Sequence, residues 1–135
     1  MALFTKLSKY SATGLLIMRV GLGIMMVLHG YPKLAGGSGK WAKIGGAMAN
    51  MGVTAYPEIW GLMASLAECL GGVFLILGFF FRPSCLLLLF TMIVACMSHL
   101  AGGDGIMGAS HAIELGIVFL GLFILGPGKY SIDKS

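Results

Sequence analysis

The chain has 135 residues, of which 58% are hydrophobic and only 10% are charged, and its mean hydropathy is +0.95. A water-soluble domain of this length cannot bury so much apolar surface, because small folds leave a large share of their chain exposed. The net charge of +4 is spread along the chain without a dense basic stripe, which argues against nucleic-acid binding. The composition therefore indicates a membrane protein.

Four apolar runs follow one another along the chain, at residues 12–29, 59–81, 83–100 and 109–126. Each approaches the roughly 20 residues that an α-helix needs to cross a bilayer. Within lipid the backbone must satisfy its own hydrogen bonds, and four short strands could not close a barrel. We therefore predict an all-α fold: one domain over residues 1–135, an integral membrane bundle of four transmembrane helices.

The loop after the first span carries a helical pattern of its own. Trp41, Ile44, Met48 and Met51 recur at helical spacing, with lysines elsewhere around the wheel. This pattern predicts a short amphipathic helix over residues 40–51 that lies at the membrane interface. The alternative is a loose loop with scattered apolar residues.

Lysine and arginine residues near the span ends predict the orientation. Five of them fall on the side that holds both termini, and three fall on the opposite side. Because cytoplasmic loops carry the excess of positive charge, we expect both termini in the cytoplasm.

Two charged residues interrupt the spans, Arg19 in the first and Glu68 in the second. Ionisable groups at such depth are costly, by roughly 2.5–3.5 kcal/mol each. Counted along the apolar runs, the two lie at similar depth, so we expect them to form an ion pair near the middle of the membrane. The pair would either fix the helix register or pass protons.

Polar residues also gather near the span ends on the side away from the termini. We expect His29, His99 and His111 to meet there, with Glu114 one turn after His111 and Lys33 just beyond the first span. In one interpretation these five residues bind a polar head group and exchange protons. In the other, the histidines are interfacial residues without a ligand.

No known metal or cofactor motif accompanies these residues. Histidine and methionine are ligand types that copper accepts, but ten methionines in an apolar chain are better explained as core packing, so we predict no metal site. The three cysteines form neither a CxxC motif nor a paired framework. Motifs for flavin, covalent haem and iron–sulfur clusters are absent from the sequence, as are P-loop, GxSxG and HExxH motifs.

The order of several short motifs resembles the DoxX family of small four-helix bacterial membrane proteins, named after a subunit of a thiosulfate:quinone oxidoreductase. The likeness covers nearly the whole chain, and it implies that the membrane is the bacterial inner membrane. It is carried by Arg19 followed by His29-Gly30-Tyr31-Pro32-Lys33-Leu34, by Glu68 with Gly71-Gly72, by Gly78 before Arg82, and by the closing stretch Leu125 to Asp133. The family's polar positions match Arg19, His29, Lys33 and Glu68.

This resemblance implies a membrane subunit that binds a quinone or a similar amphiphile and serves a redox enzyme. Because the sequence has no redox-cofactor motif, a partner subunit or the quinone pool would carry the electrons. Membrane lipids, a second membrane-associated subunit and a homo-oligomer are the expected partners. Two alternatives stay open: a non-enzymatic anchor or assembly subunit of a larger complex, and a small oligomeric transporter.

Overall fold

The computed structural model describes residues 3–133, which form helices and connecting turns and contain no strand. The elements in chain order are η1 (Thr5–Tyr10), α1 (Ser11–Ala35), α2 (Gly37–Gly45), η2 (Gly46–Met51), α3 (Pro57–Leu77), α4 (Phe81–Ala101) and α5 (Gly105–Leu125). Four helical segments are long and apolar enough to cross a membrane: Thr5–Ala35, α3, α4 and α5. The prediction of an all-α four-span bundle is confirmed.

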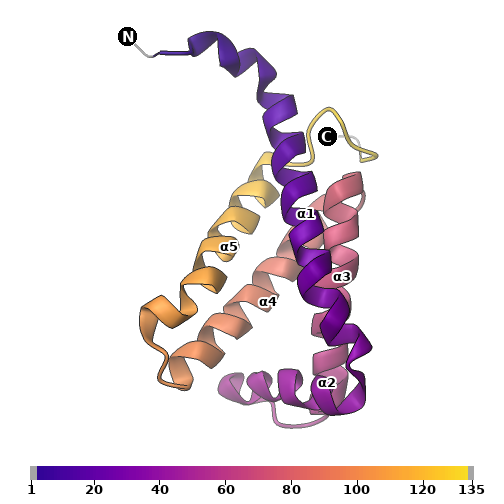
Figure 1. The fold of residues 1–135 in the computed structure, drawn as a ribbon, viewed down its shortest axis with the longest axis vertical. Helices are drawn as coiled ribbons and strands as arrows, with labels where there is room; N and C mark the ends of the chain where they lie inside the picture. The colour runs from indigo at the N-terminus through magenta and orange to yellow at the C-terminus, as the bar shows by residue number, and fades with distance from the viewer. Residues whose placement is uncertain (1–2, 134–135) are drawn as a thin grey trace.

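The four spans form an open array rather than a closed ring (Figure 1). Helix α1 packs on α3, α3 packs on α4, and α4 packs on α5, whereas no Cα atom of α1 lies within 8 Å of one in α5. The described parts of both chain ends lie at one end of the bundle, called here the terminal end. The other end, where α2 and the α4–α5 turn lie, is called the loop end. Which end faces the cytoplasm stays a prediction.

The α1–α3 contact depends on glycines that let two backbones meet. The buried residues Arg19, Gly23, Met26 and Gly30 follow one another at spacings of four, three and four along α1. A Cβ atom added to Gly23 would lie 2.5 Å from the carbonyl oxygen of Gly72 on α3, too close for any side chain. Small residues at such positions are typical of membrane helix crossings. This crossing sets the register between α1 and α3.

The core lies between the four spans. Its buried members are Met26, Leu75, Phe81, Cys85, Leu88, Met92, Ala112, Phe119 and Leu122. Most large apolar side chains outside this cluster are exposed, among them Ile17, Leu28, Ile117 and Ile124. In water such a surface would drive aggregation, but in a bilayer it is the lipid-facing surface.

Arginine side chains stabilise the terminal end of the bundle. Arg19 is 1% exposed, and its guanidinium donates hydrogen bonds of 2.7–3.0 Å to the carbonyl oxygens of Leu75, Ile76, Pro127 and Tyr130. The first two are among the last carbonyls of α3, which have no partner within the helix. A cation there also complements the helix dipole. Arg19 thereby fastens the segment after α5 to the end of α3.

Asp133 caps the start of α4, whereas Arg19 caps the end of α3. Its carboxylate accepts hydrogen bonds from the backbone N–H groups of Phe80 and Phe81, at 3.1 and 2.7 Å, where α4 begins. Free N–H groups at a helix start favour a negative charge. Arg82 in turn donates to the carbonyl oxygen of Phe123 in the last turn of α5, at 3.0 Å. The closing stretch of the sequence is therefore a structural clasp across three helices.

At the loop end two helices extend beyond the predicted spans. Helix α1 continues six residues past position 29, to Ala35, with Pro32 inside its last turns. Helix α5 begins at Gly105, four residues before the predicted start at 109. Both extensions are rich in glycine or contain proline, which the apolar pattern alone does not assign to a helix. As a result His29 and His111 lie inside helices rather than at their ends.

The predicted interfacial helix over residues 40–51 is confirmed as helical, in the form of α2 followed by η2. Helix α2 runs across the loop end of the bundle (Figure 1). The indole Nε1 of Trp41 donates to the carbonyl oxygens of Lys33 and Leu34, at 3.1 and 3.2 Å, and Met48 is buried. These contacts turn the apolar face of α2–η2 toward the bundle and hold it to the end of α1.

Candidate functional site

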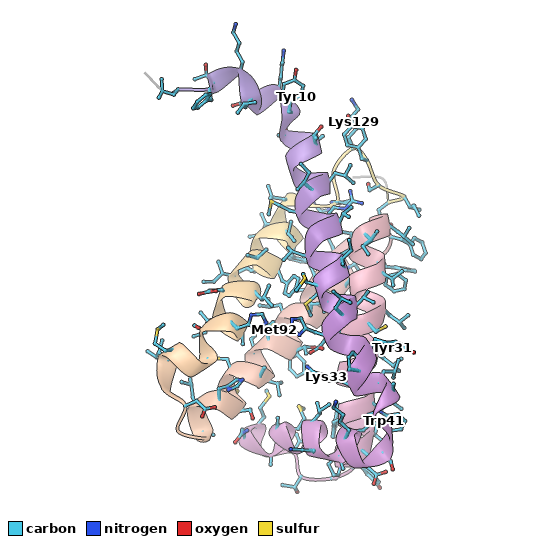
Figure 2. The ribbon with its side chains drawn as sticks, in the orientation of Figure 1. Tyr10, Tyr31, Lys33, Trp41, Met92 and Lys129 are labelled. Atoms are coloured by element: carbon cyan, nitrogen blue, oxygen red, sulfur yellow. The ribbon has the colours of Figure 1, made fainter. Side chains whose placement is uncertain are left out.

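The central ion pair of the protein joins Lys33 to Glu68. The ammonium of Lys33 lies 3.1 Å from each carboxylate oxygen of Glu68. The Glu68 side chain is 6% exposed, and that of Lys33 is 36% exposed. The pair can form because Gly30, one turn before Lys33, lets α1 approach Glu68 and Cys69 closely: an added Cβ would lie 2.6 Å from the backbone nitrogen of Cys69. Figure 2 shows Lys33 near the loop end of α1.

The predicted ion pair between Arg19 and Glu68 was wrong. Within residues 3–133 the Arg19 guanidinium contacts carbonyl oxygens at the terminal end, while Glu68 pairs with Lys33. The antiparallel register explains the error: Arg19 lies level with Ile76, eight residues or roughly 12 Å along α3 from Glu68. Because α1 extends to Ala35, Arg19 lies 16 residues from the loop end of its helix, farther than the apolar run suggested.

A cavity of about 710 Å³ lies mainly between α3 and α4 and reaches α2 and η2 at the loop end. This volume is within the range of small-molecule sites in proteins, about 300–1,000 Å³. Its walls on α4 run from Phe80 to His99, 19 residues or roughly 28 Å along the helix. That length is close to the thickness of the hydrocarbon core, about 30 Å. The cavity is thus an elongated groove that follows most of the length of α4.

The chemistry of the cavity differs between its two ends. Its walls are mostly apolar and include Met63, Leu70, Phe74, Leu87, Phe90 and Val94. The charged or imidazole groups that line it are Lys33, Lys43, Glu68 and His99, and none of them lies in the part near Phe80 and Pro83. The polar groups therefore lie in the half of the cavity nearer the loop end, with Glu68 the deepest of them, and the apolar part extends toward the terminal end. This polarity suits a molecule with a polar head and an apolar tail.

The five residues predicted to share one pocket are divided by the structure into two places. Lys33 and His99 line the cavity, whereas His29, His111 and Glu114 are not among its lining residues. The imidazoles of His29 and His111 do meet, with ring centroids 5.5 Å apart. They meet across the gap between α1 and α5, whose backbones do not approach each other. The single three-histidine pocket was therefore a wrong prediction.

His99 has a different partner from the one expected. Its Nδ1 lies 2.8 Å from Oδ2 of Asp104, and both side chains are about half exposed. Asp104 belongs to the glycine-rich turn between α4 and α5, so this pair lies at the loop end of the cavity. Glu114 is exposed on α5, with no hydrogen bond or ion pair to another side chain among residues 3–133.

Lys43 and Asp104 are site residues that the sequence did not reveal. Lys43 was expected to lie away from the apolar face of its helix, yet it lines the cavity beside Ile44. Its position depends on α2 crossing close to α3, where Gly45 meets Pro57 and Gly61 meets Trp41 without room for a Cβ atom. Glycines at 45 and 61 were the only sequence signal of this crossing. No group of three or more potential metal ligands occurs within the described residues.

The fold and the cavity together define a small multi-pass membrane protein with an elongated groove that is polar toward one end. The chain belongs to the DoxX family, whose model matches residues 14–101. The resemblance found in the sequence is thereby confirmed.

Two relatives from Escherichia coli (strain K12) extend this comparison. The chain is 29% identical to the inner membrane protein YphA over 128 residues, which cover 89% of this chain and 88% of YphA. It is 30% identical to the inner membrane protein YqjF over 131 residues, which cover 95% of each chain. No solved structure matches the chain significantly. The relatives and the four apolar spans fit a multi-pass inner membrane protein.

Proposed function

We propose that the protein binds a quinone or a similar membrane amphiphile in the α3–α4 cavity and serves a membrane redox enzyme as a subunit. The observation that supports this most is the cavity itself, about 710 Å³ in volume and apolar along most of its length. An isoprenoid tail would lie along the apolar walls. The head group would lie at the loop end, near Lys33, Glu68, Lys43 and His99.

Each polar residue at that end has a distinct part in the proposal. Lys43 supplies an ammonium donor to a ring oxygen, and His99 can donate or accept a proton. The carboxylate of Glu68 is oriented by its ion pair with Lys33, at 3.1 Å. The family resemblance suggests quinone as the amphiphile. Electron transfer would require a partner subunit, because this sequence carries no redox-cofactor motif.

The ligand would reach the site from the bilayer rather than from water. Helix α2 covers the loop end of the cavity and is fixed there by its close crossing with α3 and by the hydrogen bonds of Trp41. Several cavity walls, including Met63, Leu70, Leu87 and Phe90, also belong to the exposed apolar surface. An amphiphile dissolved in lipid can therefore enter sideways between α3 and α4.

The test is to purify the protein in a mild detergent and identify the co-extracted amphiphile by mass spectrometry. Lys43→Gln should lower the amount of bound ligand, whereas Lys40→Gln should not, because Lys40 lies on the same helix but does not line the cavity. Retention that is equal in both variants would remove Lys43 from the site. A protein that carries no amphiphile but co-purifies with a membrane complex would instead support the anchor alternative.

A further inference from the structure

A second polar site lies on the side of the bundle where α1 and α5 do not pack. His29 on α1 and His111 on α5 each lie six residues from the loop-end terminus of their helix, roughly 9 Å along the axis. Their rings meet at a centroid distance of 5.5 Å. Glu114, three residues after His111, lies nine residues or roughly 14 Å into α5, close to the middle of a hydrocarbon core of about 30 Å.

Glu114 is the residue at this site that most needs an explanation. Its side chain is exposed, so at mid-membrane depth it faces lipid or the α1–α5 gap. Charged groups in that position are costly, and those that occur are commonly functional. Without a cationic partner a carboxyl group in lipid is stable only in its neutral, protonated form. The structure thus places an acid that has no side-chain partner among residues 3–133 one helical turn from His111, whose ring contacts that of His29.

We propose that Glu114, His111 and His29 form a proton-binding site that exchanges protons with the loop end. A proton passes from the imidazolium of His111 to the Glu114 carboxylate: the N–H bond breaks, an O–H bond forms, and both groups become neutral. His111 then regains a proton from His29 or from water at the loop end. This site is separate from the α3–α4 cavity, and its existence does not depend on the ligand proposed there.

Among residues 3–133, no other charged group near Glu114 is available to exchange protons with it. Helix α4 packs against α5. The titratable residues of α4 are Arg82 and His99 near its two ends, Cys85 in the core, and Cys96 on the flank of the α4–α5 contact away from Glu114. Helix α1 contributes Arg19, which contacts carbonyl oxygens at the terminal end, and Lys33, which pairs with Glu68. Within residues 3–133, His29 and His111 are the titratable groups placed to exchange with Glu114.

The experiment uses dicyclohexylcarbodiimide, a lipid-soluble reagent that adds to protonated carboxyl groups, on the protein in native membranes. Mass spectrometry of peptides should find the adduct on Glu114 and none on Glu68, whose buried carboxyl group is occupied by the ion pair with Lys33. The adduct should be absent in Glu114→Gln and should decline as pH rises. A water-soluble carbodiimide should label Glu58, which is exposed in the first turn of α3, and spare Glu114.

Two further variants test the histidines. His111→Ala should move the pH profile of Glu114 labelling, whereas His99→Ala should leave the profile unchanged, because His99 contacts Asp104 instead. Absence of labelling at Glu114 in membranes, or equal labelling of Glu114 and Glu58 by the water-soluble reagent, would overturn the proposal. An unchanged pH profile in His111→Ala would remove the proton exchange between His111 and Glu114.

Discussion

The Lys33 ammonium on α1 lies 3.1 Å from both carboxylate oxygens of Glu68, near the middle of α3. This pair joins two helices and also forms part of the cavity wall. Removing one partner should cost more than removing both, because a lone buried charge keeps its desolvation penalty. A single contact thus connects the stability of the bundle to the chemistry of the cavity.

A double-mutant cycle measures this relationship. We expect Lys33→Met to destabilise the protein, and Glu68→Gln in the same chain to recover part of the loss, with a coupling energy of about 0.5–3 kcal/mol. Thermal unfolding in detergent provides the measurement. Glu58→Gln is the matched control, since Glu58 is exposed, and its effect should be small. Strictly additive effects of Lys33→Met and Glu68→Gln would show that the pair contributes nothing.

Arg19 should be one of the most sensitive positions in the protein. Arg19→Lys retains the charge, but a single ammonium cannot reproduce the planar fork that reaches four carbonyl oxygens. We expect a loss of about 3–5 kcal/mol, in the range for breaking a buried charged network. Arg82→Lys should cost much less, because Arg82 is exposed and makes one hydrogen bond. Similar unfolding temperatures for both variants would contradict the assigned role of Arg19.

The α1–α3 crossing predicts opposite responses from two nearby glycines. Gly23→Ala places a methyl group 2.5 Å from the carbonyl oxygen of Gly72 and should destabilise the protein by about 1–3 kcal/mol. Gly21→Ala meets no atom within 4 Å and should be neutral or mildly stabilising. Chemical unfolding in detergent distinguishes the two. Equal stability would mean that the two backbones can move apart at little cost.

Asp133 offers a separate test of the clasp at the terminal end. Asp133→Ala removes the acceptor for the first N–H groups of α4, and we expect a loss of about 1 kcal/mol, as for other helix caps. The effect should be largest at the terminal end, so hydrogen exchange should rise first at the start of α4. Faster exchange at the loop end instead would argue against local capping.

The sequence was sufficient to predict the four spans, the helix at residues 40–51 and the family, because apolar periodicity and motif order are local signals. It could not predict which polar residues pair, because pairing depends on register. The α1–α3 register is set by close approach at Gly23, Gly30 and Gly72. In this register Glu68 lies level with Lys33 and not with Arg19.

The histidines illustrate the same limit. The prediction that His29 and His111 lie at similar depth was correct, and their rings are in contact. The sequence could not reveal that α1 and α5 stay apart while α3 and α4 enclose a cavity, because both facts follow from the order of packing around the bundle. His99 was therefore assigned to the wrong neighbours, and Lys43 was missed.

The central claim is that the α3–α4 cavity holds a membrane amphiphile, and filling the cavity tests it most directly. Ala64→Phe introduces a ring into the cavity wall on α3, whereas Val73→Phe adds the same ring to the exposed surface of the same helix. The measurement is the molar ratio of co-purified quinone or other amphiphile to protein, at equal yield and unfolding temperature. We predict a marked loss in Ala64→Phe and no loss in Val73→Phe. Undiminished binding in Ala64→Phe would contradict the assignment of the ligand to this cavity.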